Sequence, residues 1–189
     1  MIPYTCSLLP FIMSIVITAT DCQEPPGSHS SPESNWLLRH VAKVVLVSDL
    51  RQVALMHNKL NSFVGLPGGG IFSSETIRAG AIRECEEETG VTPAIVAKLG
   101  RFEDFRCRNR ARYISHGFLA TTAHYGEPVL THKEAEIGLH TEWHSIDNAA
   151  RLLTTQVALM DAISFYNTSF NVLRDHILFT KSIPLLDSL

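Results

Sequence analysis

The sequence has no excess of positive charge. Its 189 residues contain 16 Lys and Arg against 19 Asp and Glu, so the formal net charge is -3 at pH 7. A chain with this balance has no general field that would hold a nucleic-acid backbone by counterion release. We therefore expect no nucleic acid among its partners, and any anionic substrate must be bound by local features.

Cysteine is scarce, and its spacing carries no metal-binding pattern. The four cysteines, Cys6, Cys22, Cys85 and Cys107, form no C-x-x-C pair and no zinc-finger spacing. A chain of this size builds a hydrophobic core without disulfide staples. We therefore predict four free thiols and a reducing compartment, the cytoplasm. The histidines are also dispersed, so each is interpreted as a surface or core residue and not as a metal ligand.

The N-terminal region lacks the length and charge of a clear targeting segment. Residues 2–18 are apolar, but they contain two prolines and no basic start, and a spanning helix needs about 20 apolar residues. Residues 23–35 are rich in Pro, Ser and Gly, which is typical of a linker. We predict a poorly ordered segment over 1–35 and one domain over 36–189. Secretion or membrane anchoring through residues 2–18 is the alternative.

From Trp36 onward, the pattern predicts alternating strands and helices. Strands are expected at 40–47 and 51–56, joined as a hairpin at Ser48-Asp49, and at 95–105, 113–122 and 142–146, with a break near Gly100. A helix capped by Ser73 or Ser74 should end at Gly90. Further helices are expected at 147–153, capped by Asp147, at 156–166, which ends at Asn167-Thr168-Ser169, and at 170–179. This order predicts a mixed sheet packed between helices.

The helix before Gly90 carries three glutamates on one face. Glu84, Glu87 and Glu88 stand at positions i, i+3 and i+4, so their carboxylates project toward a common point. Hard divalent ions such as Mg²⁺ prefer such oxygen ligands. Glutamate-rich helices are also common as solvated surfaces, and a bare cluster would favour that interpretation. The fixed register of four further residues, Gly69, Glu75, Arg83 and Gly90, argues against chance.

Residues Gly69 to Val91 (GGIFSSETIRAGAIRECEEETGV) resemble the Nudix box, G-x5-E-x7-R-E-U-x-E-E-x-G-U, where U is a bulky aliphatic residue. Every specified polar and glycine position matches. The one departure is Cys85 at the first U position, where a thiol packs as a small hydrophobic group. The resemblance implies the Nudix fold, an α/β/α sandwich.

The same resemblance implies a metal site. Glu84, Glu87 and Glu88 would be ligands of Mg²⁺ or Mn²⁺, and Gly69 would offer its backbone carbonyl. One of these glutamates, or a glutamate outside the box, would act as the base on the attacking water. We therefore expect a metal-dependent hydrolysis without a covalent nucleophile.

Two more residues of the box have implied catalytic roles beside Glu87 and Glu84. Arg83 would pair with a box glutamate and orient it. Glu75 would brace the loop against the helix or contact the metal through water. All of these residues are present, which argues against a degenerate box.

The function that the resemblance implies is hydrolysis of a diphosphate (pyrophosphate) linkage in a nucleoside diphosphate derivative, a small-molecule substrate. The alternative is a Nudix-fold binding or regulatory module without turnover. A diphosphate isomerase on a related fold is disfavoured, because its additional cysteine and glutamate signature is missing. No membrane partner is expected, and homodimerisation is left open.

Four arginines alternate after the predicted strand 95–105: Arg106, Arg108, Arg110 and Arg112. In a strand or hairpin this period puts several guanidinium groups on one face, which suits substrate phosphates. The opposing interpretation is a solvated hairpin tip turning at Asn109. A split is also considered, in which Arg106 and Arg112 flank the site and bind substrate.

Two downstream acids, Glu134 and Glu136, lie in a segment that resembles the region from which many Nudix enzymes draw an extra ligand or base. The segment EAEIGLHTEW favours Glu136 as a substrate-site residue. A loop charge without a role is the opposing interpretation for both.

Overall fold

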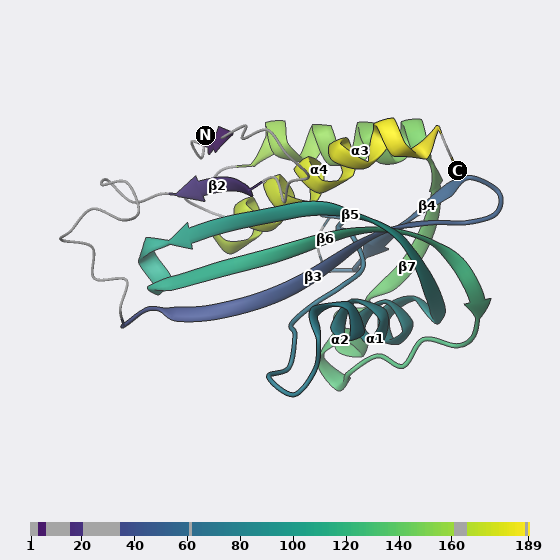
Figure 1. The fold of residues 1–189 in the computed structure, drawn as a ribbon, viewed down its shortest axis with the longest axis horizontal. Coiled ribbons are helices and arrows are strands. Elements are labelled where there is room, and N and C mark those ends of the chain that lie inside the picture. The colour runs from purple at the N-terminus through teal and green to yellow at the C-terminus, as the bar shows by residue number, and fades with distance from the viewer. Residues whose placement is uncertain (1–3, 7–15, 21–34, 61, 161–165, 188) are drawn as a thin grey trace.

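The computed structural model describes residues 4–6, 16–20, 35–60, 62–160, 166–187 and 189. Figure 1 shows the arrangement of the helices and strands. In chain order the elements are β1 (Tyr4–Cys6), β2 (Val16–Thr20), β3 (Leu37–Val47), β4 (Gln52–His57), α1 (Ile77–Thr89), β5 (Val91–Arg106), the short 3-10 helix η2 (Cys107–Asn109), β6 (Ala111–Tyr125), α2 (His132–Glu136), β7 (His140–Ser145), α3 (Ile146–Leu159) and α4 (Tyr166–Leu186).

The strands form one mixed sheet in the order β1-β2-β5-β6-β3-β4-β7. β2 runs parallel to β5 and β3 runs parallel to β6, while the other neighbouring pairs are antiparallel. Helices α3 and α4 cover one face of the sheet, and α1 and α2 lie on the other (Figure 1). The predicted mixed sheet between helices, an α/β/α sandwich, is confirmed.

Strands β3 and β4 form the predicted hairpin. Ser48 N–H donates to the carbonyl of Gln52 at 2.8 Å, and Gln52 N–H donates to the Ser48 hydroxyl at 3.1 Å. Residues 44–47 are buried without alternation. β3 lies between β4 and β6 with helices over both faces, and a strand in that position needs apolar side chains on each side.

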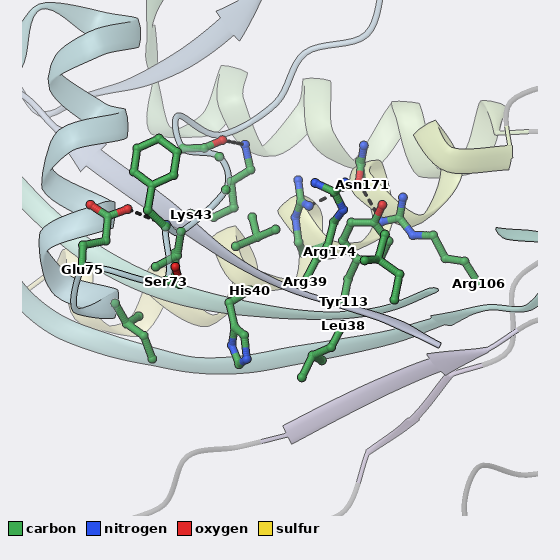
Figure 2. Close-up of a pocket in the computed structure, with 18 of the residues that line it drawn as sticks. Leu38, Arg39, His40, Lys43, Ser73, Glu75, Arg106, Tyr113, Asn171 and Arg174 are labelled. Carbon is green, nitrogen blue, oxygen red and sulfur yellow. Dashed lines mark hydrogen bonds between the residues drawn. The ribbon is translucent and has the colours of Figure 1, made fainter. Parts of the chain in front are cut away.

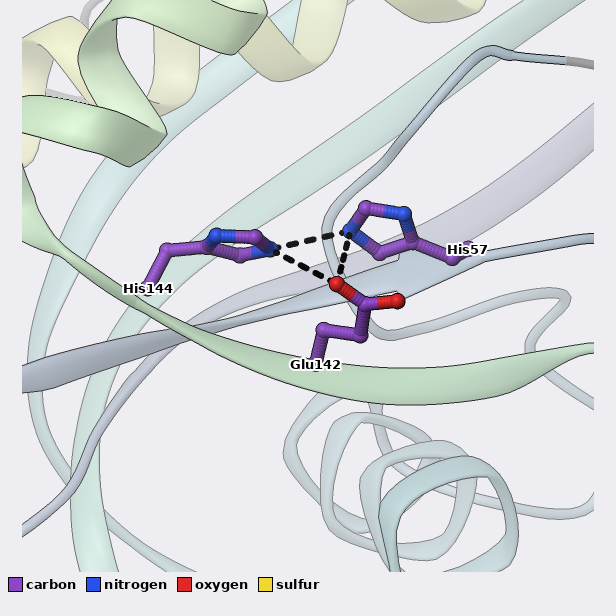
Figure 3. A group of neighbouring side chains, drawn as sticks. All are labelled: His57, Glu142 and His144. Carbon is purple, nitrogen blue, oxygen red and sulfur yellow. Dashed lines mark hydrogen bonds and ion pairs between the residues drawn. The ribbon is translucent and has the colours of Figure 1, made fainter.

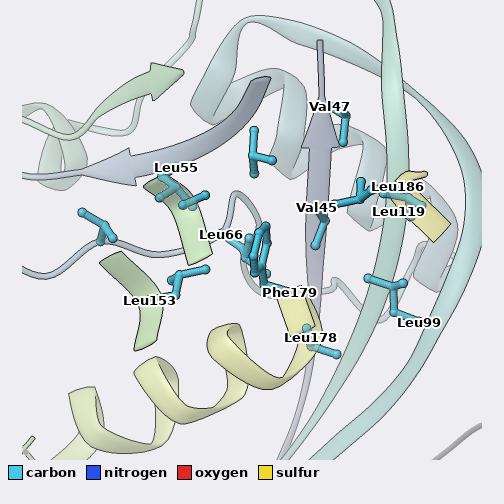
Figure 4. Packing of buried hydrophobic residues seen from close by; sticks show 13 residues of the cluster. Val45, Val47, Leu55, Leu66, Leu99, Leu119, Leu153, Leu178, Phe179 and Leu186 are labelled. Atoms are coloured by element: carbon cyan, nitrogen blue, oxygen red, sulfur yellow. The ribbon is translucent and has the colours of Figure 1, made fainter. Parts of the chain in front are cut away.

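The core lies on both faces of the sheet. Figure 4 shows the larger cluster, in which Leu153 of α3 and Leu178 and Phe179 of α4 pack against Val45 and Leu55 of the sheet. On the opposite face, a smaller cluster packs α1 against the sheet through Ala81 and Cys85. Cys85 is fully buried, as expected for a thiol that packs as a small hydrophobic group.

The start of α1 differs from the prediction, because Thr76 and not Ser73 or Ser74 caps the helix. The Thr76 hydroxyl accepts from Ala79 N–H at 3.1 Å. The two serines lie in a preceding turn, which Glu75 closes by accepting from Phe72 N–H at 2.8 Å. The predicted end at Gly90 is confirmed, since Gly90 has the left-handed φ of 71°.

The C-terminal helices also differ from the prediction. Ser145 caps α3 by accepting from Asn148 N–H at 3.2 Å, so Asp147 lies inside the first turn, and α3 continues to Leu159. The predicted break at 167–169 is wrong, because α4 begins at Tyr166 and passes through these residues. Ser169 and Phe170 are buried there, and this tertiary packing overrides the weak helix propensity of the polar run.

Strands β5 and β6 are longer than predicted and form a hairpin closed by η2. The expected break near Gly100 does not occur, because β5 is continuous. The strand has instead a shift of register between Lys98 and Gly100 and a φ of 108° at Gly100. The shift bends the long hairpin, which lets it curl over the rest of the sheet.

The prediction that all four cysteines are free thiols is wrong for Cys107, which is disulfide-bonded. Cys85 is free and buried. A disulfide requires two cysteines with a short Cα separation in the folded chain, and spacing along the sequence does not reveal that distance.

Most of the segment 1–35 lies outside the described residues, so its predicted disorder, signal peptide or anchor stays a prediction. Within it, β1 pairs with β2, and β2 pairs with β5 over residues 101–105. Among the described residues, none of the helices combines the length and apolar character needed to cross a membrane.

We predict that Gly90→Ala lowers the free energy of unfolding by about 1 to 3 kcal/mol. Gly90 has a left-handed φ, and an added Cβ would lie 2.6 Å from the carbonyl oxygen of Gly126. Urea unfolding measures the loss. Gly70→Ala is the matched control, because a Cβ there meets no atom within 4 Å, and it should change stability by less than about 0.5 kcal/mol. Equal stability of the two variants would contradict this account.

Candidate functional site

The glycine-rich loop before α1 is bonded along β3. Ala42 N–H donates to Gly69 O and Val44 N–H donates to Pro67 O, each at 3.0 Å. Gly68 has a φ of 125°, and a Cβ at this position would lie 2.2 Å from the Ala42 carbonyl oxygen. Only glycine therefore lets the loop approach the strand this closely.

Arg83 connects the loop to the glutamates of α1. Its Nε donates to Glu75 Oε2 at 3.1 Å, and its Nη2 donates to Glu75 Oε1 at 2.7 Å and to the Gly70 carbonyl at 2.9 Å. Its Nη1 donates to Glu84 Oε1 and Glu87 Oε2, each at 2.9 Å. Glu75 thus ties the loop to the helix through Arg83. The bonds to Glu75 raise the pKa of Arg83 and lower that of Glu75.

Glu84 and Glu88 lie directly against the glycine-rich loop. Glu88 Oε2 accepts from Gly68 N–H at 2.6 Å, and the Glu84 carboxylate packs so closely on Gly69 that a Cβ there would lie 2.3 Å from it. Burial raises the pKa of Glu84, and burial raises the pKa of Glu88 to about 7. Two carboxylates held next to each other away from water are favourable sites for a cation.

Lys43 of β3 is a second cation, after Arg83, whose charge acts on these carboxylates. Its Nζ donates to the carbonyl of Leu66 at 2.9 Å and to that of Gly68. Burial lowers the pKa of Lys43. Its positive charge opposes the effect of burial on Glu88 and Glu84, so it reduces the rise of their pKa values. Lys43 therefore offsets part of the negative charge and also holds the loop.

A cavity of about 930 Å³ borders this loop (Figure 2). Gly68 and Gly69, which contact Glu88 and Glu84, belong to its wall, and so does Glu75. The rest of the wall is mixed. It includes the apolar residues Leu37, Leu38, Val41, Ile71, Phe72 and Ile77 and the polar or cationic residues Arg39, His40, Lys43, Arg106, Tyr113, Asn167, Asn171 and Arg174. The carboxylate pair and a cavity with four cationic side chains therefore share one loop.

Two arginines of the cavity wall, Arg106 and Arg174, are buried and are fixed by buried partners. Arg106 Nε donates to Asp104 Oδ1 at 2.5 Å, and its guanidinium lies 3.9 Å from the centre of the Tyr113 ring. Arg174 Nε donates to Asp175 Oδ1 at 2.7 Å. Burial raises the pKa of Asp104. These pairs orient the guanidinium groups toward the cavity, as Figure 2 shows for Arg106 and Arg174.

The four alternating arginines do not form one wall. Arg106 lines the cavity, whereas Arg112 pairs with Glu103, lies over the Phe105 ring and is not one of the lining residues. Arg108 lies over the Tyr166 ring, and both Arg108 and Arg110 are exposed at the hairpin tip, where Asn109 ends η2.

The downstream acids lie on α2. Glu136 is exposed and pairs with His132 at 3.2 Å. Glu134 closes a capping box with Thr131, and its charge contributes to the raised pKa of Glu88. The sequence favoured Glu136 over Glu134. In the structure, however, Glu134 is the one whose negative charge acts on the glutamates of α1.

Sequence reasoning missed Lys43 and Arg174. Both had a visible signal, because each is a charged residue inside an apolar run, Lys43 in HVAKVVLV and Arg174 in FNVLRDHILF. A charge at such a position is expected to have a buried partner. Which loop or cavity the charge faces depends on the tertiary fold.

A second cluster involves histidines. Within the part of the chain that the structure describes, one group of three side chains brings its ligand atoms within 4.8 Å of one another: His57, Glu142 and His144. Glu84, Glu87 and Glu88 do not converge that closely, since Arg83 Nη1 lies between Glu84 and Glu87.

Comparisons with known proteins agree with this geometry. The family model of the NUDIX domain matches residues 38–163. A NUDIX hydrolase from Nitrosomonas europaea is 19% identical, with a TM-score of 0.51 over 61% of this chain and 78% of that chain. A MutT protein from Bacillus halodurans is 26% identical, with a TM-score of 0.50 over 60% of this chain and 72% of that chain. A search of the curated proteins found no match.

The half-buried His116, which contacts the cavity residue His40, should make stability depend on pH. Burial, and then the charge of His40, lowers the pKa of His116 to about 4, whereas the unfolded chain takes up the proton near pH 6.5. Because the unfolded state binds more protons between these values, the contribution of His116 to stability is lost as pH falls from 6.5 to 4.

We predict that, as pH falls through this range, the free energy of unfolding of His116→Gln rises by about 1 kcal/mol relative to that of the wild type. This value is smaller than the pKa shift alone implies, because the His116 ring is partly solvated. Urea unfolding at pH 7 and pH 5 gives the difference. His132→Gln, which removes an exposed histidine, should show no such trend. A pH-independent difference for His116→Gln would contradict the prediction.

Proposed function

This chain belongs to the Nudix family and is a Nudix hydrolase, and on that premise we propose that it uses a divalent ion to cleave the diphosphate linkage of a nucleoside diphosphate derivative. The observation that carries the proposal is the pair Glu84 and Glu88, buried against the loop that also forms the wall of the cationic cavity. The loop thus adjoins both this pair of carboxylates and a cavity whose wall includes four cationic side chains, Arg39, Lys43, Arg106 and Arg174.

The donor set fits a hard divalent ion. Nudix hydrolases generally use divalent metals. Glu84, Glu87, Glu88 and the carbonyl of Gly69 offer only oxygen atoms, which Mg²⁺ and Mn²⁺ prefer. Burial already raises the pKa of Glu84 and Glu88, so a cation at this position would relieve an existing cost. When bound, the ion supplies charge neutralisation at the diphosphate and a lower pKa for water.

Arg83, Glu75 and Glu87 then have separate roles in orienting the site and moving the proton. Arg83 holds the carboxylates of Glu84 and Glu87 in place, and Glu75 holds Arg83. We assign the base to Glu87, whose side chain is 43% exposed and so meets water more readily than Glu84, which is 14% exposed. Glu87 takes the proton of the attacking water, whose oxygen bonds to one phosphorus of the diphosphate. The bond between that phosphorus and the bridging oxygen breaks, and the other phosphate group leaves with the bridging oxygen.

The cavity supports an anionic substrate with a large organic group. Arg39, Lys43, Arg106 and Arg174 place positive charge around a volume in the range of small-molecule sites, and Tyr113 adds an aromatic ring. Guanidinium groups match phosphate oxygens with two parallel hydrogen bonds. We propose that the nucleoside side of the diphosphate lies in this cavity.

The disulfide at Cys107 bears on the compartment. The cytoplasm was predicted from free thiols, but disulfides persist mainly in oxidising compartments. We therefore propose an oxidising compartment ahead of the cytoplasm. Homodimerisation stays a prediction.

We predict that Glu87→Gln lowers kcat by about 10² to 10⁴-fold, because it removes the base without removing the side-chain volume. Product release is measured with Mg²⁺ on nucleoside triphosphates, nucleotide sugars, ADP-ribose and dinucleoside polyphosphates. Glu86→Gln is the matched control, since Glu86 is the neighbouring acid outside the proposed ligand set, and it should keep near wild-type kcat. If wild type and Glu87→Gln were equally inert on every substrate, the hydrolase proposal would fail and a binding module would lead.

We predict that Arg39→Gln raises KM about tenfold and leaves kcat nearly unchanged, because Arg39 is an exposed residue of the cavity wall and contacts substrate without contacting the reacting atoms. Steady-state kinetics on the best substrate of the panel gives both constants. Arg108→Gln removes an equally exposed arginine outside the cavity and should change neither. An unchanged KM for Arg39→Gln would place the substrate elsewhere.

A further inference from the structure

The paired strands β4 and β7 gather histidines on one face of the sheet. In their antiparallel register His57 stands opposite His140, Leu55 opposite Glu142, and Val53 opposite His144. Side chains alternate along a strand, so residues 140, 142 and 144 share a face. Thr141 lies on the other face, where its hydroxyl donates to the Glu88 carbonyl of α1 at 3.4 Å. The histidine face is therefore the one opposite the glutamate helix.

Three of these side chains point toward one another (Figure 3). His57 Nε2 and His144 Nε2 are 3.0 Å apart, and Glu142 Oε2 is 3.7 Å from each. A point equidistant from these three atoms lies about 2.0 Å from each, and ligand distances to Zn²⁺ are about 2.0 to 2.2 Å for histidine nitrogen and carboxylate oxygen. The triangle already has the size of a metal site.

Neighbouring groups hold the three side chains in this arrangement. His140 Nε2 lies 3.1 Å from the second carboxylate oxygen, Glu142 Oε1, and His140 Nδ1 lies 2.9 Å from the Gly138 carbonyl. The side-chain amide of Asn148 lies 2.8 Å from His144 Nδ1. Such outer contacts orient the ligands of known metal sites. The side chains of His57 and His144 are only 20% and 12% exposed, so their orientation is also set by packing.

We propose that His57, Glu142 and His144 form a second metal site, separate from the glutamate helix, that binds a Zn²⁺-type ion. Two imidazoles and one carboxylate suit Zn²⁺, Co²⁺ or Ni²⁺, whereas Mg²⁺ prefers oxygen ligands. In the metal-free chain one proton between His57 Nε2 and His144 Nε2 links the two rings. The ion takes that place and the proton moves to His144 Nδ1. The Asn148 amide turns its oxygen to accept this proton, and the oxygen gives up the hydrogen bond that it accepts from the exposed Arg151 at 2.6 Å.

The site would act as a clamp. β7 is the last strand of the sheet beside β4, and its C-terminal residue Ser145 caps α3. A metal ion bound by His57 of β4 and by Glu142 and His144 of β7 would fix this edge of the sheet. Anything that binds only the folded state raises its stability.

The test uses the full chain, treated with a chelator and titrated with Co²⁺. Imidazole and carboxylate ligands in tetrahedral geometry give Co²⁺ a stronger visible absorption than water does. We expect this absorption to appear and saturate in the wild type, to persist in excess Mg²⁺, and to disappear when Zn²⁺ displaces Co²⁺. Zn²⁺ should also raise the Tm of the wild type.

Variants locate the ion. His144→Gln and the conservative, more exposed Glu142→Gln should each weaken Co²⁺ binding at least about tenfold. The Tm of each metal-free variant, measured beside that of the metal-free wild type, shows whether the variant folds. His132→Gln, which removes an exposed histidine on α2, and Glu87→Gln, which alters the glutamate helix, should keep the absorption.

Three results would overturn the proposal. They are the absence of the absorption in the wild type, its survival in folded His144→Gln and Glu142→Gln, and its loss in Glu87→Gln, which would place the ion on the glutamate helix. Failure of the hydrolase assay leaves this readout unaffected, because Co²⁺ absorption requires no turnover.

Discussion

The functional site depends on the hydrogen bonds that the Arg83 guanidinium donates to Glu75, Glu84 and Glu87. Three carboxylates at i, i+3 and i+4 repel one another, and a guanidinium that bonds Glu84 and Glu87 reduces that repulsion while Glu75 holds it from the loop side. Arg83 therefore orients Glu84 and Glu87, and it also fixes the glycine-rich loop that forms part of the cavity wall. Glu88 is held separately by Gly68 N–H.

Much of the site could be predicted because its residues are local in sequence. Helix periodicity alone places Glu84, Glu87 and Glu88 on one face, and the box adds Arg83, Glu75 and Gly69 at fixed offsets. The hairpin and the helix end at Gly90 were also predicted, since each has a turn or glycine signal. Gly100 marked the right place in β5, where the strand shifts its register and does not break. The mixed sheet between helices followed from the order of the elements.

The remainder depends on contacts between distant segments. Helix α4 passes through a polar run at 167–169 because Phe170 is buried against other segments, and Arg112 leaves the cavity because Glu103 pairs with it. Cys107 forms a disulfide that spacing did not reveal. The alternation of His140, Glu142 and His144 was visible, but bringing His57 beside them required the register of β4 and β7.

We propose that the divalent ion of the hydrolase binds to the glutamates beside the glycine-rich loop. Mn²⁺ titration followed by electron paramagnetic resonance tests it directly, since bound Mn²⁺ loses the signal of the free ion. We expect that Glu88→Gln weakens Mn²⁺ binding about tenfold or more, while the neighbouring Glu86→Gln binds as the wild type does. Equal Mn²⁺ affinity in Glu88→Gln and the wild type would contradict it.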